Sequence, residues 1–156
     1  MSSANLTDLV LRPATRDDAA TLAEVHTASR SAAVRSGSMP PSIHAAVDIQ
    51  PWLAGRLERD DVWVAEVAGA AVAYLRLSDA WLDDLYVVPA RVGQGIGSAL
   101  LEIAKVLRPA GFGLWVFETN HPARAFYAAH GMVEVERTDG RDNEERAPDL
   151  RMVWAP

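Results

Sequence analysis

The sequence predicts an α+β domain with a mixed, mostly antiparallel sheet of about seven strands and about four flanking helices. Two observations predict this class. Three β patterns follow one another with short links between residues 62 and 88, which is typical of an antiparallel meander. The third of these strands is followed by an apolar helical pattern and then by another strand, which should therefore lie parallel to it.

Length, charge and composition restrict the class of protein further. The 156 residues fit one domain spanning 1–156, with enough length to bury a sizeable core. The net charge of −6 and the lack of a basic patch argue against DNA or RNA as a partner. No apolar run approaches the ~18 residues of a membrane span, and residues 1–12 have neither the basic nor the apolar region of a secretory signal. The absence of cysteine is compatible with a reducing cytoplasm, where we expect the protein.

The N-terminal third is predicted to contain one strand and two helices. A strand at 9–12 is followed by a helix that starts with the acidic residues 17 and 18 and continues to about residue 31. The segment 36–42, which contains Gly and two prolines, is a predicted loop. A second helix is expected over 43–57, broken or kinked by Pro51.

The middle and C-terminal parts supply the remaining strands and helices. Ala68–Gly69 is a hairpin signal between the first two strands of the meander, and Gly131 should end the last helix. The predicted strands are 62–67, 70–77, 81–88, 112–118, 132–137 and 150–154, and the predicted helices follow Gly95 and cover 123–130.

A glycine-rich turn joins the third meander strand to the helix after it. Pro89 ends the strand, Gly93, Gly95 and Gly97 follow, and apolar residues then recur three and four apart. A strand, a glycine turn and a helix start place free backbone N–H groups and the positive helix end at one point. The sequence therefore predicts a phosphate-binding site here.

Other interpretations of this turn fit less well. A P-loop needs a lysine before its final Ser or Thr, and Ser98 follows Gly97 directly. The dinucleotide pattern is nearly present, with Ser98 at its third position and Glu118 about 20 residues on. However, only residues 119–156 remain after Glu118, and the unit follows a meander instead of opening a parallel sheet. A purely structural turn would not need three glycines.

Two segments carry a family resemblance. Residues 87–101, VVPARVGQGIGSALL, resemble the acetyl-CoA motif of the GNAT superfamily of N-acetyltransferases, and residues 120–132, NHPARAFYAAHGM, resemble its second motif. The sequence departs from the family pattern at Val92, where Arg or Gln is usual and Arg91 stands one place earlier, and at Met132, which replaces a Phe. The resemblance implies the GNAT fold, in which the parallel strand pair splays apart at the cofactor site.

The resemblance also implies a cofactor site for acetyl-CoA. Backbone N–H groups from Val92 to Gly97 would hold its pyrophosphate, and the amide of Val87 or Val88 would polarise the thioester carbonyl. Tyr127 would protonate or hydrogen-bond the departing sulfur, and Asn120 would contact pantetheine or an ordered water. The expected cofactor-binding residues are Val87, Val88, Val92, Gly93, Gln94, Gly95, Ile96, Gly97, Ser98, Asn120 and Tyr127. The four histidines have no metal-ligand spacing, so we expect no metal.

The sequence leaves several candidates for the general base and several classes of acceptor. Asp83 and Asp84 lie on opposite faces of a predicted strand, so one should point toward the cleft, and Glu118 and an ordered water are alternatives. The expected reaction is transfer of an acetyl group to a primary amine, either a small molecule or a peptide N-terminus. In the family, the acceptor pocket corresponds to residues 30–52 and 139–149. The second segment carries five acids and two arginines, which would attract a cationic amine unless it is only a solvated loop. A homodimer is compatible with the resemblance, and a non-catalytic acyl-CoA-binding module is the alternative function.

Overall fold

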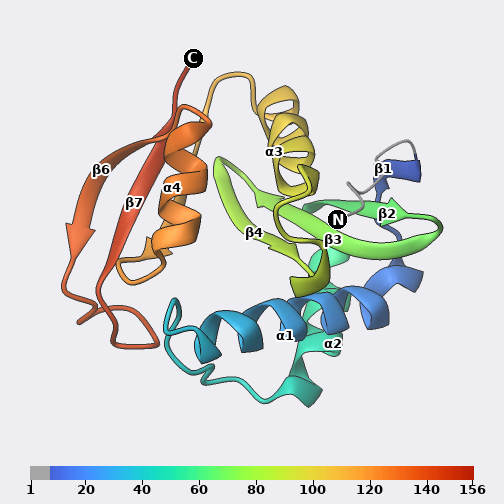
Figure 1. Cartoon of the computed structure of the whole chain (residues 1–156), viewed down its shortest axis with the longest axis horizontal. Coiled ribbons are helices and arrows are strands. Elements are labelled where there is room, and N and C mark those ends of the chain that lie inside the picture. The colour runs from blue at the N-terminus through green and yellow to red at the C-terminus, as the bar shows by residue number, and fades with distance from the viewer. Residues whose placement is uncertain (1–7) are drawn as a thin grey trace.

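The computed structural model describes residues 8–156 and contains seven strands and four helices (Figure 1). Residues 1–7, which belong to the segment searched above for a secretory signal, lie outside the description. In the described part, no helix combines the length and the apolar character that crossing a membrane requires. The elements are β1 (Leu9–Pro13), α1 (Ala19–Arg35), α2 (Ala46–Leu57), β2 (Asp61–Val67), β3 (Ala70–Ser78), β4 (Trp81–Val87), α3 (Ile96–Leu107), β5 (Phe112–Phe117), α4 (His121–Ala129), β6 (Val133–Thr138) and β7 (Asp149–Trp154).

The strands form one sheet in the order β1-β2-β3-β4-β5-β7-β6. Every neighbouring pair is antiparallel except β4 and β5, which are parallel. The predicted fold class is therefore confirmed, including the meander. Its first hairpin turns at Ala68 and Gly69 with φ angles of 50° and 81°, the positive values that a tight two-residue turn requires.

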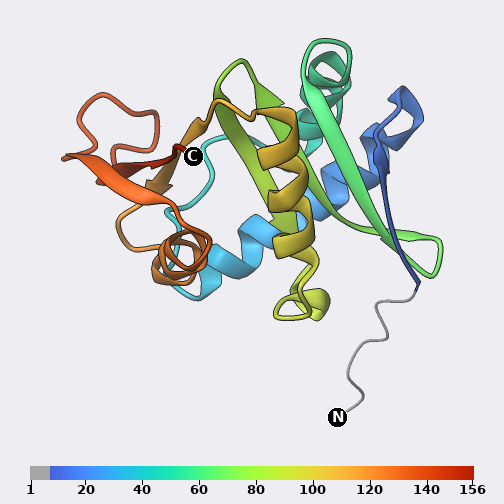
Figure 2. The same cartoon turned by 90° about the horizontal axis from the view of Figure 1, so that it is seen from above.

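The parallel pair is joined at a single point of register, Trp81 opposite Gly113. A side chain at Gly113 would place its Cβ 3.2 Å from the Trp81 ring, so glycine permits this close approach. Beyond this point β4 continues to pair with β3 and β5 with β7, while the two strands diverge from each other (Figures 1 and 2). The splayed pair that the family resemblance implied is present.

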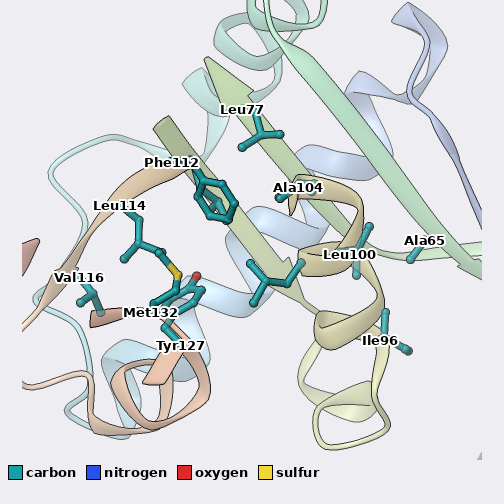
Figure 3. Close-up of a cluster of buried hydrophobic side chains, with 14 of the residues drawn as sticks. Ala65, Leu77, Ile96, Leu100, Ala104, Phe112, Leu114, Val116, Tyr127 and Met132 are labelled. Atoms are coloured by element: carbon teal, nitrogen blue, oxygen red, sulfur yellow. The ribbon is translucent and has the colours of Figure 1, made fainter. Parts of the chain in front are cut away.

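Two apolar clusters hold the helices against the sheet. The larger one includes α3, β5 and α4, and Figure 3 shows Leu114, Met132 and Tyr127 close together in it, with Ile96, Leu100 and Ala104 on α3. The smaller one joins Leu22 of α1 and Leu53 of α2 to β2 and β3. The two clusters fix α1 and α3, the two helices nearest to β4, relative to that strand.

The predicted element boundaries are wrong by a few residues in three places. Helix α1 continues to Arg35, and α2 begins at Ala46. Pro51 lies inside α2 without ending it, since Ile49 and Leu53 on either side are buried and anchor the helix across the proline. Helix α4 begins at His121, one residue before Pro122.

Candidate active site

The glycine turn adopts the backbone that its sequence demands. Gly93 and Gly95 have φ angles of +80° and +84°, in the left-handed region that favours glycine, and Gly95 is the N-cap of α3. Gly97 has ordinary helical geometry. A Cβ there would lie 3.5 Å from the ring of Phe126, an ordinary van der Waals contact, so α4 packs against the start of α3 at this point.

The amides of this turn are available to a ligand. In the described chain, no backbone carbonyl accepts the N–H groups from Gly93 to Ser98, and the first bond of α3 runs from Ala99 N to Gly95 O at 3.1 Å. The Val92 amide makes only a long bond, 3.4 Å, to Pro89 O. Free amides at a helix N-terminus form an anion-binding concavity, because their partial positive charges converge on one point.

A cavity of about 490 Å³ connects this turn to the end of β4, to α1 and to α4. It brings both sequence motifs to one place, although residues 93 and 120 are far apart in the chain. The predicted site residues that line it are Val87, Val92, Gly93, Gly95, Gly97, Ser98, Asn120 and Tyr127. Val88, Gln94 and Ile96 do not line it, and Ile96 is buried in the larger apolar cluster.

The structure distinguishes the two amides at the end of β4. The Val88 N–H donates to Val72 O at 2.9 Å, so it is occupied by the ladder with β3. Backbone groups alternate in direction along a strand, so the Val87 N–H points away from β3 and toward the gap. The Val87 carbonyl accepts a bond from Ser29 Oγ of α1 at 2.7 Å, which fixes this peptide against the helix. Val87 is therefore the residue whose amide faces the cleft.

Tyr127 and Asn120 enter the cleft from α4. Tyr127 is 8% exposed, and burial raises the pKa of its hydroxyl above the usual 10.0, so the group keeps its proton. No side chain among residues 8–156 hydrogen-bonds this hydroxyl. In this part of the chain every fully buried polar side-chain atom has a hydrogen-bond partner, so the Tyr127 hydroxyl must be in contact with solvent. Asn120 caps α4, accepting from Ala123 N at 3.3 Å.

A second cavity of about 410 Å³ adjoins the cleft, and Tyr86 lines both. It is acidic, with five carboxylates and two arginines in its wall. The loop 139–149 closes one side, and His44 Nε2 lies 3.2 Å from Glu144 Oε2 across the mouth. The lining residues are His26, Arg30, Ser42, His44, Asp48, Ile49, Trp52, Arg76, Asp83, Asp84, Tyr86, Glu144 and Glu145.

The three carboxylates considered as bases have different surroundings. Asp84 is 6% exposed and accepts from Arg76 Nε at 2.8 Å and from the Tyr74 hydroxyl at 3.0 Å. Asp83 is more exposed and accepts from Ser78 Oγ, and burial raises the pKa of its carboxyl. Glu118 lines neither cavity.

Sequence reasoning missed the polar residues that connect α1 to β3 and β4. His26, Tyr74, Arg76 and Tyr86 form this group, and three of them line the acidic cavity. The one sequence signal is His26, which continues the buried face of α1 begun by Leu22. Among residues 8–156, no group of three or more His, Cys, Asp or Glu side chains is placed to hold a metal ion.

Residues 58–134 match the family model described as an acetyltransferase (GNAT) domain. The match makes these residues similar to a GNAT acetyltransferase domain. They include β4, the glycine turn and α4, which build the cleft.

Comparisons with individual proteins agree. An uncharacterized N-acetyltransferase of Archaeoglobus fulgidus is 34% identical over 101 residues, which are 52% of this chain and 65% of that protein. This chain thus spans less than two thirds of that relative. A GCN5-related N-acetyltransferase of Rhodopseudomonas palustris has the same fold, with a TM-score of 0.79 and 24% identity over 94% of this chain and 95% of its own. The PaiA N-acetyltransferase of Thermoplasma acidophilum, solved in complex with coenzyme A, has a TM-score of 0.72 and 20% identity over 95% and 99% of the two chains.

Proposed function

We propose that this protein is an acetyl-CoA-dependent N-acetyltransferase that acts on a primary amine. The observation that carries the proposal is the content of one cavity. Free amides of the glycine turn, the end of β4 that carries the inward-facing Val87 amide, and Tyr127 all line it. The coenzyme A complex of the PaiA neighbour, which has the same fold, supports the choice of cofactor.

The residues present fit this cofactor. The amides from Gly93 to Ser98 would hold its diphosphate, and beyond Trp81 and Gly113 the facing edges of β4 and β5 form no ladder with each other. Bound there, acetyl-CoA would supply the thioester whose carbonyl carbon receives the amine.

The chain's own groups then have distinct tasks. The Val87 N–H donates to the carbonyl oxygen, on which negative charge develops during attack. As the new C–N bond forms and the C–S bond breaks, the Tyr127 hydroxyl gives its proton to the departing sulfur. The raised pKa of Tyr127 keeps the hydroxyl protonated and available to the sulfur at neutral pH, although it also makes the group a weaker acid.

The acceptor would enter from the acidic cavity, which meets the cleft at Tyr86. Five carboxylates exceed two guanidinium groups there, and Arg76 is already paired with Asp60 and Asp84. The remaining field attracts a cation, so we propose an ammonium-bearing acceptor, either a small amine or a peptide N-terminus.

The test is thiol release from acetyl-CoA with a panel of polyamines, amino sugars, amino acids and peptides. We expect turnover with cationic acceptors and a fall in kcat of about a hundredfold in Tyr127→Phe, the lower end for a lost general acid. Acetyl-CoA affinity, measured by calorimetry, should change little in this variant. Binding of acetyl-CoA without turnover of any amine would support the binding-module alternative, and a preference for anionic acceptors would contradict the proposed acceptor class.

A further inference from the structure

Three side chains form a hydrogen-bonded chain from the core to the acidic cavity. His26 Nδ1 of α1 lies 2.9 Å from the Tyr74 hydroxyl of β3, and this hydroxyl lies 3.0 Å from Asp84 Oδ2 of β4. All three side chains are buried, with exposed fractions of 8%, 0% and 6%. The arrangement couples a carboxylate to an imidazole through a phenol.

The chain has one consistent set of proton positions. Arg76 Nε donates to the same Asp84 oxygen at 2.8 Å, so this oxygen is an acceptor in both of its hydrogen bonds. The single Tyr74 proton must therefore point to Asp84, and the Tyr74 oxygen must accept from His26. Neutral His26 consequently carries its proton on Nδ1, and its Nε2 has a free lone pair.

This lone pair is open to the acidic cavity. His26 lines that cavity and the adjacent one of about 350 Å³ that extends along α1. Among the described residues Nε2 has no hydrogen-bond partner. Every polar side-chain atom there that lacks a partner is in contact with solvent, and Nε2 is therefore one of these atoms. His26 Nε2 is thus an accessible acceptor in a ring that is otherwise buried.

Its place on α1 brings it close to the reacting end of β4. Ser29, three residues later, bonds the Val87 carbonyl at 2.7 Å, and Arg30 lies 3.2 Å from the Tyr86 hydroxyl. Residues three and four apart share a helix face, so His26 lies one turn along the same face. The rings of His26 and Tyr86 are in edge contact, with centroids 5.0 Å apart.

We propose that His26 Nε2 accepts the proton of the attacking amine, with Tyr74 and Asp84 as positioning residues. This rests on the proposed acetyl transfer. The amine nitrogen bonds the carbonyl carbon, its surplus proton passes to Nε2, directly or through one water, and the Tyr127 proton goes to the sulfur. The imidazolium then gives its proton to solvent through the cavity, and the Tyr127 phenolate takes a proton from solvent, so both groups return to their starting states. Asp84 stabilises the imidazolium across Tyr74 and does not itself take the proton.

The charges around the ring suit this task. Burial has the largest influence on the pKa of His26 and lowers it. The nearby charge of Asp84 raises this pKa, and the charges of Arg30, Arg76 and His44 lower it further. The ring is therefore neutral at neutral pH and ready to accept. An ammonium nitrogen becomes far more acidic once it bonds a carbonyl carbon, so a weak base suffices.

The proton positions can be tested without turnover. In ¹⁵N imidazole spectra of the whole protein at pH 7.5, we expect the His26 ring to show a protonated Nδ1 and an unprotonated Nε2. Tyr74→Phe should change this pattern, and His121→Asn, at an exposed position outside both cavities, should leave it unchanged. A His26 ring protonated on Nε2 would overturn the proposal whatever the catalytic activity.

Kinetics of His26→Asn test the catalytic role. Asparagine keeps a donor for Tyr74 at the Nδ1 position and lacks a basic nitrogen. We expect kcat to fall about a hundredfold, with KM for acetyl-CoA within about threefold, and the acid limb of the kcat–pH profile to disappear. His121→Asn should behave as wild type.

Each outcome separates the two proposals. If wild type turns over an amine and His26→Asn retains its kcat and acid limb, the His26 proposal fails and the acetyltransferase proposal stands. If wild type binds acetyl-CoA but acetylates no amine in the panel, both fail. Should His26→Asn not fold, as judged by circular dichroism, Tyr74→Phe decides. In that variant kcat should fall, by less than about a hundredfold because the base itself remains, and the acid limb should shift; an unchanged kcat and an unchanged acid limb would overturn the proposal.

Discussion

Replacing Arg76 with methionine should destabilise the protein more than any change at a surface ion pair. The Arg76 side chain is 8% exposed and lies 2.7 Å from Asp60 and 2.8 Å from Asp84, whose side chains are 6% and 7% exposed. Asp83 is a third, looser partner at 3.7 Å. Methionine has similar volume and no charge, so the substitution leaves two buried carboxylates without a cation.

The expected loss follows from this geometry. Removing one member of a buried ion pair costs about 3–5 kcal/mol, because the charge left behind stays desolvated. For a chain of this length, each kcal/mol corresponds to roughly 2–4 °C, so the melting temperature should fall by roughly 6–20 °C. Asp84 keeps only the Tyr74 hydroxyl as a donor, and the positioning of His26 should weaken with it.

The assay is urea unfolding followed by tryptophan fluorescence and circular dichroism. The matched control is Arg151→Met, which removes an ion pair with Glu136 of 3.0 Å whose side chains are 34% and 49% exposed, and should cost less than about 1 kcal/mol. Adding Asp60→Asn and Asp84→Asn to Arg76→Met should recover part of the loss. A loss below about 1 kcal/mol for Arg76→Met, or no recovery in the triple variant, would refute the reasoning.

Three further predictions concern the cleft and its supports. Tyr127→Phe removes a hydroxyl with no hydrogen-bond partner among residues 8–156, so the free energy of unfolding should change by less than about 0.5 kcal/mol while kcat falls. A large loss of stability would show that the hydroxyl has a structural role. Gly93→Ala should cost about 1–2 kcal/mol through its positive φ and weaken acetyl-CoA binding in calorimetry, whereas Gly55→Ala, inside α2 with open space around it, should stabilise by about 0.5–1 kcal/mol. Equal effects of the two substitutions would contradict the assigned strain. A hydrogen bond from Arg12 lowers the pKa of Asp18 below its usual 3.8, so the stability from this pair is complete above that pH and is lost as pH falls through the lowered value. Unfolding measured between pH 2 and 7 should therefore show a flatter acid limb for Asp18→Asn, and an unchanged limb would exclude the pair as its source.

The fold and the cofactor cleft were predictable because their signals are local. The turn at Ala68–Gly69, the strand end at Pro89 and the glycines after it each constrain their own backbone, and together they give the element order. Free amides are also a local property, since they follow from a glycine turn at the start of a helix.

The polar chain of His26, Tyr74 and Asp84 was not predictable for the opposite reason. His26 and Tyr74 are 48 residues apart, and no periodic pattern records that α1 packs over β3 at this point. Sequence spacing likewise could not choose between Val87 and Val88, since the choice depends on which amide β3 takes. The sequence allowed Pro51 either to break or to kink the second helix; the break is excluded because burial of its neighbours maintains the helix.

The single point of register between β4 and β5 has a mechanical consequence. The sheet therefore consists of two parts, β1 to β4 and β5 to β7, which are joined only at Trp81 and Gly113 and diverge from there. Facing main-chain groups along the open edges would accept an extended guest carrying amides as if it were an extra strand. A ligand bound in this way would contact both parts of the sheet and restrict their movement relative to each other. Binding of the cofactor would therefore make the whole sheet more rigid.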